Sequence, residues 1–396
     1  MLNNLRKGVV VVATIALLVL GLTLSATAQE PDQAAGVPAG QITISGPVTG
    51  VSFSTAAQAA AVAYWSKDRL VAAAPLVVAS QTTGDSSPVL DAPAALGPSN
   101  PGFTAPGAPA ADADRQARRA YPREWAAMDA AVRDEIRNAS AWVESPAAPE
   151  GTSQTFTSYI INQQAAVQKN FPHRVAGKLT FNTPAGPSSC SASVISGNNV
   201  IVTAAHCVYD TPTRNQFYTN IVFTPAFRNG NAPYGTFPAQ NCWVLTSWIN
   251  LSGGYAINTW ADDDVAVCKM GNNSANKALS NLTGWFGRAW DQGYVQHFHT
   301  LGYPVNSTAN TALPNGGKYL RSCQSESFQQ AADVVGTGCD LGPGHSGGAF
   351  IVGYKLNEVS GQVRSVYSGY FTNTNNAYGA RFTSNNIVPL CNVAGC

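Results

Sequence analysis

Three short polar segments of this chain carry side chains that could act together in nucleophilic catalysis. His206 follows the apolar run 200–202 in the sequence Thr-Ala-Ala-His-Cys, and Ser346 lies in the glycine-rich sequence Gly-Pro-Gly-His-Ser-Gly-Gly. Asp262–Asp264 lie between them and precede another apolar run. A serine hydroxyl becomes an effective nucleophile when an imidazole accepts its proton and a buried carboxylate orients the imidazole. The three segments supply all the groups needed for hydrolysis at a carbonyl carbon.

The glycines beside Ser346 predict a tight turn whose backbone amides point inward. The amides of Gly344 and Ser346 are candidates for an oxyanion hole, a pair of donors that stabilises the negative oxygen of a tetrahedral intermediate. One such donor contributes about 3 to 4 kcal/mol to transition-state stabilisation. A Gly-x-Ser-x-Gly sequence also occurs in α/β-hydrolases, but that fold needs alternating strands and helices, which the surrounding sequence lacks. An ordinary glycine loop is the alternative.

The elements that must position these residues are short strands. From Gln154 onward, apolar runs are separated by Gly, Asn, Pro and Ser, and we expect strands at 174–181, 191–195, 200–203, 221–224, 265–269, 297–301, 349–352 and 365–371. Short strands with frequent turns and no helices between them indicate an all-β barrel or sandwich. Residues 152–396 are long enough to form two small barrels.

The first 28 residues have the three parts of an export signal. Arg6 and Lys7 form the positive part, residues 8–24 are almost wholly apolar, and residues 26–28 form an Ala-x-Ala cleavage site. We therefore expect a secreted, extracellular chain that begins at or after Gln29. An uncleaved membrane anchor is the alternative, because about 17 apolar residues can just span a bilayer.

Residues 29–151 contain no cysteine and are rich in Ala, Pro, Ser and Gly, which is typical of a removable pro-region or linker. The prolines between Ser87 and Ala110 predict an extended, mobile tether, because proline cannot donate a backbone hydrogen bond. Apolar periodicity predicts helices over 57–73 and 122–143. We expect these helices to assist folding or to mask the active site, as in a zymogen; a solvated spacer is the alternative.

All eight cysteines lie in the last 207 residues of the chain, from Cys190 onward. An even number of cysteines behind an export signal indicates disulfides formed in an oxidising compartment. Sequence spacing favours pairs of neighbours, and one such bond contributes about 3 kcal/mol by restricting the unfolded chain. The expected pairs are Cys190 with Cys207, Cys242 with Cys268, Cys323 with Cys339, and Cys391 with Cys396.

Composition and spacing argue against two other kinds of site. Charged residues are only 11% of the chain and the net charge is +1, so we expect no nucleic-acid partner. His297 and His299 would share one face of a strand, as metal ligands can. No third ligand follows nearby in the sequence, and we expect neither a metal nor a cofactor.

The sequence Thr-Ala-Ala-His-Cys at 203–207 and the sequence Gly-His-Ser-Gly-Gly at 344–348 resemble the histidine and serine signatures of trypsin-like peptidases. The resemblance extends over about 172–389 and implies a chymotrypsin-like double β-barrel, with barrel one over about 152–284 and barrel two over about 285–396. Two further segments, Gly-Lys-Leu from Gly177 and Gly-Tyr-Pro from Gly302, are similar to the bacterial glutamyl endopeptidases.

In this family the triad aspartate directly precedes a hydrophobic-Ala-hydrophobic strand, which matches Asp264; Asp263 is the alternative. The resemblance implies that His206, Asp264 and Ser346 form the catalytic triad of a serine endopeptidase that acts through an acyl-enzyme. Protein or peptide substrates are then expected for a monomeric enzyme, with its own pro-region as an intramolecular inhibitor or folding aid. A serine esterase and a non-catalytic binding protein on a protease-like scaffold are the alternatives.

The residues expected to bind substrate are less clearly indicated. Asp340 lies six residues before Ser346, where a carboxylate in trypsin-like enzymes attracts Lys or Arg. Tyr367, Ser368 and Gly369 are expected to offer backbone groups to an extended peptide. Glutamyl endopeptidases carry a histidine on that strand, and this chain has none there.

One residue beside the nucleophile departs from the animal trypsins. They carry an aspartate immediately before the serine, where it pairs with a newly cut N-terminus, whereas this chain has His345. Activation through that ion pair is therefore not expected.

Overall fold

Antiparallel strands account for most of the regular secondary structure of this protein, which is described by a computed structural model. It describes residues 40–77, 102–137, 155–161, 170–210, 215–251, 261–355, 361–372 and 374–396. The expected export signal and most of the expected tether lie outside these residues. Within them, no helix is both long enough and apolar enough to cross a membrane.

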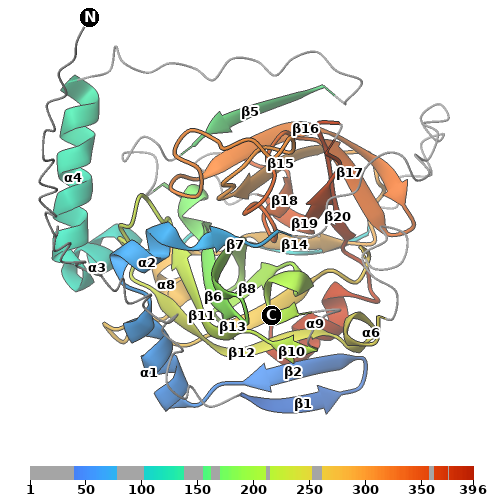
Figure 1. Ribbon diagram of the computed structural model, residues 1–396, viewed down its shortest axis with the longest axis horizontal. Coiled ribbons are helices and arrows are strands. Elements are labelled where there is room, and N and C mark those ends of the chain that lie inside the picture. Colours follow the sequence, from blue (N-terminus) through green and yellow to red (C-terminus); the bar gives the residue numbers. More distant parts are fainter. Residues whose placement is uncertain are drawn as a thin grey trace, which may run out of the picture. The chain divides into compact units, whose positions relative to one another are not determined.

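Six strands close into barrel one in the order β12-β11-β6-β7-β8-β13, with β13 paired back to β12 (Figure 1). Their inward side chains are apolar and fully buried, as at Val202, Phe223 and Val267, and burial of this surface drives the barrel to close. The strands are β6 (Ala176–Thr183), β7 (Gly186–Ser196), β8 (Val200–Thr203), β11 (Thr219–Pro225), β12 (Phe237–Leu245) and β13 (Ala266–Met270).

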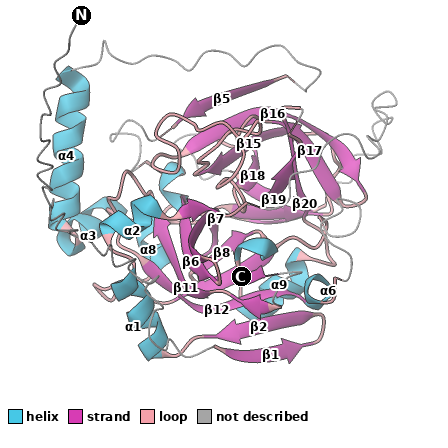
Figure 2. Ribbon diagram, in the orientation of Figure 1, coloured by secondary structure: helices cyan, strands magenta, loops and turns pink. Residues whose placement is uncertain are grey.

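Six more strands close into barrel two in the order β18-β15-β16-β17-β20-β19, with β19 paired back to β18. They are β15 (His297–Gly302), β16 (Arg321–Ala331), β17 (Val334–Gly338), β18 (Ala349–Val352), β19 (Gln362–Tyr370) and β20 (Asn376–Arg381). Figure 2 shows that strands dominate both barrels and that helices are few there. The expected all-β double barrel is confirmed. Each of the eight strands expected from the sequence is present, and β8 and β18 have the expected bounds.

Two elements lie with the barrel that is farther from them in sequence. β5 (Phe156–Ile160) lies in the segment assigned to barrel one, but it pairs with β16 of barrel two. α9 (Ile387–Ala394) follows barrel two in sequence but packs on β12 and β13 of barrel one. The reason for the second crossing is apolar burial, because Ile387 and Leu390 are covered there.

The described part of residues 29–151 is folded onto the barrels. β2 pairs with β12, β3 pairs with β7, and β4 pairs with β14 (Gly287–Trp290). Because Phe103–Ala105 form a strand, the expected tether does not extend to Ala110. These elements are β1 (Gln41–Ser45), β2 (Val48–Ser52), α1 (Thr55–Tyr64), α2 (Lys67–Ala72), β3 (Ala74–Pro75), β4 (Phe103–Ala105), α3 (Ala113–Ala120) and α4 (Pro122–Arg137).

The two expected helices differ from the observed ones. The region 57–73 forms two helices, α1 and α2, because Ser66 caps a new helix with its hydroxyl on the Arg69 amide. The second expected helix begins at Pro122 as predicted and ends at Arg137; the remaining positions to 143 lie outside the described residues. All four expected disulfide pairs are present.

Candidate active site

His206 and Asp264 are brought together by the pairing of two neighbouring strands. His206 lies in the 3-10 turn η3 (Ala205–Cys207) after β8, and Asp264 precedes β13, which pairs with β8. The Nδ1 atom of His206 lies 2.8 Å from Oδ2 of Asp264, and the backbone N–H of His206 donates to Oδ1 at 3.0 Å. Both side chains are buried. One carboxylate therefore fixes both the turn and the ring.

The alternative aspartate, Asp263, does not contact the imidazole. Its side chain is bonded to Ser247, and burial raises the pKa of its carboxyl. Within the described residues, the Nε2 atom of His206 is buried and has no hydrogen-bond partner. A carboxylate at Nδ1 favours the neutral tautomer with its proton on Nδ1, which leaves the Nε2 lone pair able to accept a proton.

The turn that carries Ser346 packs against the end of β8. Gly347 has a φ of +76°, and a Cβ atom there would lie 2.0 Å from Oγ1 of Thr203 and 3.0 Å from the amide of Ala204. Only glycine allows this approach. Gly347, the residue after Ser346, thus lies against Thr203 and Ala204, which precede His206 by three and two positions. The structure therefore brings together the serine and histidine segments.

The two amides expected to form the oxyanion hole are free to bind a ligand. In the described part of the chain, neither the Gly344 N–H nor the Ser346 N–H donates a hydrogen bond. The neighbouring amides are all used: His345 donates to Gly342 O at 3.0 Å, and Gly347 donates to Tyr367 O at 2.8 Å. An oxyanion hole requires N–H donors that are not already bonded to the protein, and these two amides meet that requirement.

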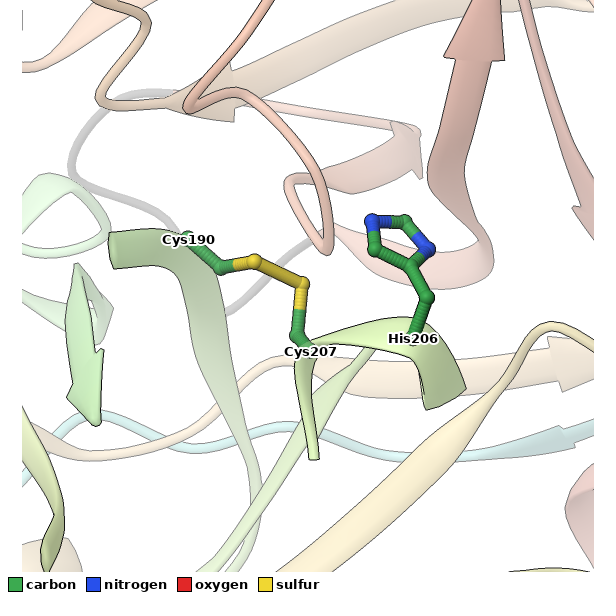
Figure 3. Close-up of side chains that lie close together, drawn as sticks. All are labelled: Cys190, His206 and Cys207. Carbon is green, nitrogen blue, oxygen red and sulfur yellow. A yellow bond between two sulfur atoms is a disulfide. The ribbon is translucent and has the colours of Figure 1, made fainter. Parts of the chain in front are cut away.

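A disulfide next to His206 anchors the histidine turn. Cys207 is bonded to Cys190 of β7, and Figure 3 shows the imidazole beside this bond. One ligand atom from each of Cys190, His206 and Cys207 lies within 4.8 Å of the others. Because both sulfurs are joined to each other, neither is available as a thiolate for a metal. The same holds for Cys323 and Cys339 beside Asp340.

β19 carries the expected peptide-binding residues along one side of the serine turn. Tyr367 N donates to Gly348 O at 2.9 Å, and β18 pairs with β19 only as far as Val366. On that side, no described strand pairs with Ser368 or Gly369, so their edge can accept an added strand. The Tyr367 hydroxyl is not available to substrate, because it is buried and donates to Leu341 O at 2.6 Å.

Asp340 and the two histidines that were considered as metal ligands contact other groups of the protein. Asp340 is partly buried, with Oδ1 at 3.7 Å from the Sγ atom of Cys323, and burial raises its pKa. His297 contacts Glu326 at the surface at 3.2 Å, whereas His299 stacks on Tyr354. The two imidazoles also contact each other edge to face, with ring centroids 5.3 Å apart.

His345 is enclosed beside Ser346 in the same turn. It has no exposed surface, and its Nε2 atom lies 2.8 Å from Oγ1 of Thr300. Burial lowers the pKa of its imidazole to about 3. His345 is therefore neutral at physiological pH and takes the aspartate's position without supplying its charge.

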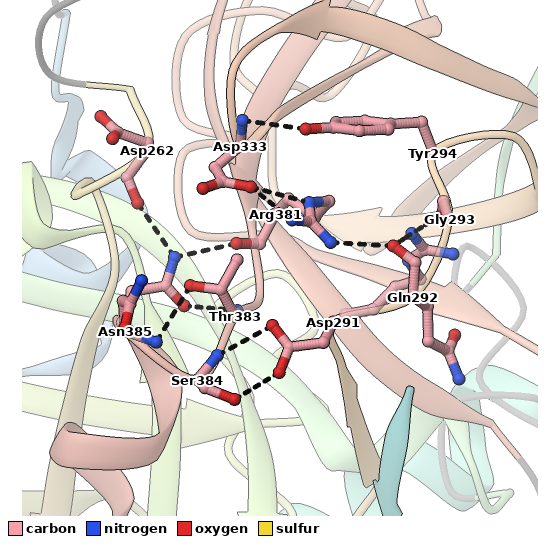
Figure 4. A network of polar contacts seen from close by, with 12 residues as sticks. Asp262, Asp291, Gln292, Gly293, Tyr294, Asp333, Arg381, Thr383, Ser384 and Asn385 are labelled. Carbon is pink, nitrogen blue, oxygen red and sulfur yellow. Dashed lines mark hydrogen bonds and ion pairs between the residues drawn. The ribbon is translucent and has the colours of Figure 1, made fainter. Parts of the chain in front are cut away.

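A polar network holds the Asp262–Asp264 turn against barrel two (Figure 4). Nδ2 of Asn386 donates to Asp262 O at 3.0 Å and to Arg381 O at 2.8 Å. Arg381 is paired with Asp333. Asn386 was not expected to take part in this arrangement, because nothing near it in the sequence marks it.

Two closed barrels with a buried His–Asp pair beside a glycine-flanked serine define a chymotrypsin-like architecture. The family model named Trypsin matches residues 160–388, and the chain belongs to this family of serine proteases. The resemblance inferred from the sequence is thereby confirmed.

Several solved structures are similar to this chain. The protease Anisep from Arthrobacter nicotinovorans has 27% sequence identity over 57% of this chain and 97% of its own, with a TM-score of 0.48. A thermostable serine protease from an extremophilic microorganism has 26% identity over 54% and 93%, with a TM-score of 0.46. A Glu endopeptidase has 19% identity over 62% and 99%, with a TM-score of 0.46. No curated protein matches the sequence.

Proposed function

We propose that the chain is a secreted serine endopeptidase with Ser346, His206 and Asp264 as its catalytic triad. The observation that carries the proposal is the 2.8 Å contact between His206 Nδ1 and Asp264 Oδ2, beside a turn in which the Gly344 and Ser346 amides donate no hydrogen bond to any described residue. Ser346 attacks the substrate carbonyl while His206 takes its proton, and the Gly344 and Ser346 amides stabilise the oxyanion. His206 then protonates the leaving amine, and water hydrolyses the acyl-enzyme by the same route.

An extended peptide would bind by adding a strand to β19 at Ser368 and Gly369. The unpaired edge of these residues supports this placement. Asp340 would favour a basic side chain at the cut position. A cleavage profile of the purified enzyme on a peptide library tests this preference, and a profile without enrichment of Lys or Arg would contradict the role of Asp340.

The N-terminal segment 40–137 is proposed to act as a folding partner of the catalytic domain. Its side chains fill sites on barrel one: the Nε1 atom of Trp65 donates to Asn220 O at 2.7 Å, and that of Trp125 donates to Pro233 O at 2.7 Å. It also supplies an ion-pair partner for the largely buried Arg174, because the Asp114 carboxylate lies 3.3 Å from the guanidinium group. Without the segment, these apolar and charged groups would face water or lose their partners.

Secretion is supported by the four disulfides and by the composition of the first 28 residues. Disulfides of this number persist in an oxidising compartment. Mass measurement of the chain recovered from culture medium tests the expected start at or after Gln29.

The catalytic assignment is tested with Ser346→Ala. The variant should lose casein hydrolysis and fluorophosphonate labelling, while its thermal unfolding stays close to wild type. Retained turnover would contradict the assignment, and absence of labelling in the wild type would favour a non-catalytic binding protein. Faster hydrolysis of short-chain esters than of casein by the wild type would favour an esterase.

A further inference from the structure

We propose that Ser191 of β7 is a positioning residue that holds the oxyanion hole in its active geometry. This inference rests on the proposed peptidase function. Ser191 is fully buried, and it is bonded to two residues of the nucleophile turn. Its hydroxyl donates to Gly344 O at 2.9 Å, and its amide donates to Ser346 O at 2.7 Å.

Further contacts hold Ser191 itself in place. Its Oγ atom accepts from the Tyr303 amide at 2.8 Å, and its carbonyl accepts from Oγ1 of Thr203 at 2.8 Å. The hydroxyl is enclosed, because a Cβ atom on Gly302 would lie 2.8 Å from it. Ser191 thus connects the nucleophile turn to β8 and to Tyr303, the residue after β15, through hydrogen bonds of its amide, carbonyl and hydroxyl.

These bonds fix the direction of alternate peptide groups in the turn. In a trans peptide the C=O and the N–H point in opposite directions. The Gly344 carbonyl accepts from the Ser191 hydroxyl, so the N–H of the same peptide, that of His345, points the opposite way, to Gly342 O. The Ser346 carbonyl accepts from the Ser191 amide, so the N–H of that peptide, that of Gly347, points to Tyr367 O. The peptide that carries the Ser346 N–H lies between these two groups, and its own carbonyl, that of His345, accepts from Gly348 N at 2.8 Å.

Gly344 makes this restraint necessary. Its φ is +93°, and a glycine has no Cβ to prevent rotation of the peptides on either side. The preceding carbonyl, that of Pro343, accepts from Val305 N at 2.7 Å, and the following one accepts from Ser191. Loss of the Ser191 hydroxyl frees one of these two anchors, so the Gly344 amide spends less time directed at the oxyanion.

The same strand supplies a matched control. Ser193 lies two residues further along β7, where side chains share one face. It is equally buried, and its Oγ atom has no hydrogen-bond partner among the described residues. Ser193→Ala therefore removes the same atom from the same strand without removing a bond to the turn.

The experiment compares full-length wild type, Ser191→Ala and Ser193→Ala. Hydrolysis of a peptide amide gives kcat and KM. Inhibition by a peptide aldehyde tests the oxyanion hole directly, because the aldehyde adduct places an oxyanion in it. Ser191→Ala should lower kcat about 10-fold to 100-fold, leave KM within about twofold, and weaken aldehyde inhibition by the same factor as kcat. Ser193→Ala should change neither. An unchanged kcat in Ser191→Ala, or an equal loss in both variants, would overturn the proposal.

Two further measurements keep the outcome unambiguous. If Ser191→Ala does not fold, Ser191→Thr keeps the hydroxyl and should hold kcat within about threefold of wild type. A folded Ser191→Thr enzyme with a kcat more than tenfold lower would contradict the proposal. Failure of the peptidase function is separate, because an inactive wild type would show no fluorophosphonate labelling at Ser346.

Discussion

At the scale of single residues, the Asp264 carboxylate serves one neighbour with both of its oxygens. Oδ2 contacts the imidazole of His206, and Oδ1 accepts from the backbone amide of the same residue. The ring can therefore neither rotate nor move with its turn without breaking a charge-assisted bond in a buried site.

Asp264→Asn should lower kcat by about four orders of magnitude, because an amide at this place favours the wrong tautomer of His206. The measurement is steady-state hydrolysis of a peptide amide. Asp263→Asn is the matched control, since the Asp263 side chain is bonded to Ser247 and not to the imidazole. Equal losses in the two variants would argue against Asp264 as the orienting acid.

The sequence identified His206 and Ser346 because their neighbours are constrained as well. The glycines around Ser346 and the cysteine after His206 are needed for local geometry, so they leave a recognisable pattern. Ser191 left none. Its partners Gly344 and Ser346 are about 150 positions away in sequence, and a serine within a strand is otherwise unremarkable.

At the scale of elements, strands were predictable where apolar residues are continuous. β8 is such a run and was located with its observed bounds. β16 was not expected, because several of its buried positions are small polar residues, including Ser325 and Ser327, whose hydroxyls donate to Thr155 O and Tyr294 O. A pattern search for apolar residues cannot find a strand of this kind.

The docking of α4 depends on Trp125. Its ring is fully buried edge-on against Tyr234, and its N–H is bonded to Pro233 O. Trp125→Ala should lower the free energy of unfolding by about 3 to 5 kcal/mol, measured by urea denaturation in a Ser346→Ala background that prevents self-digestion. The exposed Arg123→Ala on the same helix should change it by less than about 0.5 kcal/mol. No difference between the two variants would show that α4 is not docked in solution.

At the scale of the whole molecule, Lys178 of β6 connects three parts of the chain. Its buried ammonium group donates to Leu70 O in α2 at 2.9 Å and to Gly317 O before β16 at 3.2 Å. Burial lowers the pKa of this group from 10.5 to about 7. Only part of this arrangement was foreseeable, because the resemblance implied two barrels but gave no sign of the N-terminal segment that covers Lys178.

The pKa of Lys178 predicts a stability that rises with pH. Between pH 7 and 10.5 the unfolded chain binds more protons at this residue than the folded one, so the free energy of unfolding rises by up to about 1.4 kcal/mol per pH unit. Below pH 7 the cost of the buried charge is fully present. Lys178→Met should remove this slope in urea denaturation at pH 7, 8 and 9, whereas the exposed Lys277→Met should keep it. A slope that survives in Lys178→Met would refute the assignment.

The position of α9, which follows barrel two in sequence but packs on barrel one, determines when during synthesis barrel one can be covered. Barrel two is not closed until β20 has been made, and barrel one is not covered until α9, which ends at Ala394. In a chain made with its N-terminus first, the strands of barrel one are complete at Met270, but barrel two can close only after β20, and α9 can cover barrel one only later still. If the proposed peptidase function holds, we therefore expect peptide cleavage to begin only after β20 and α9 have been made, so the machinery that makes this chain is protected from it by the order of synthesis.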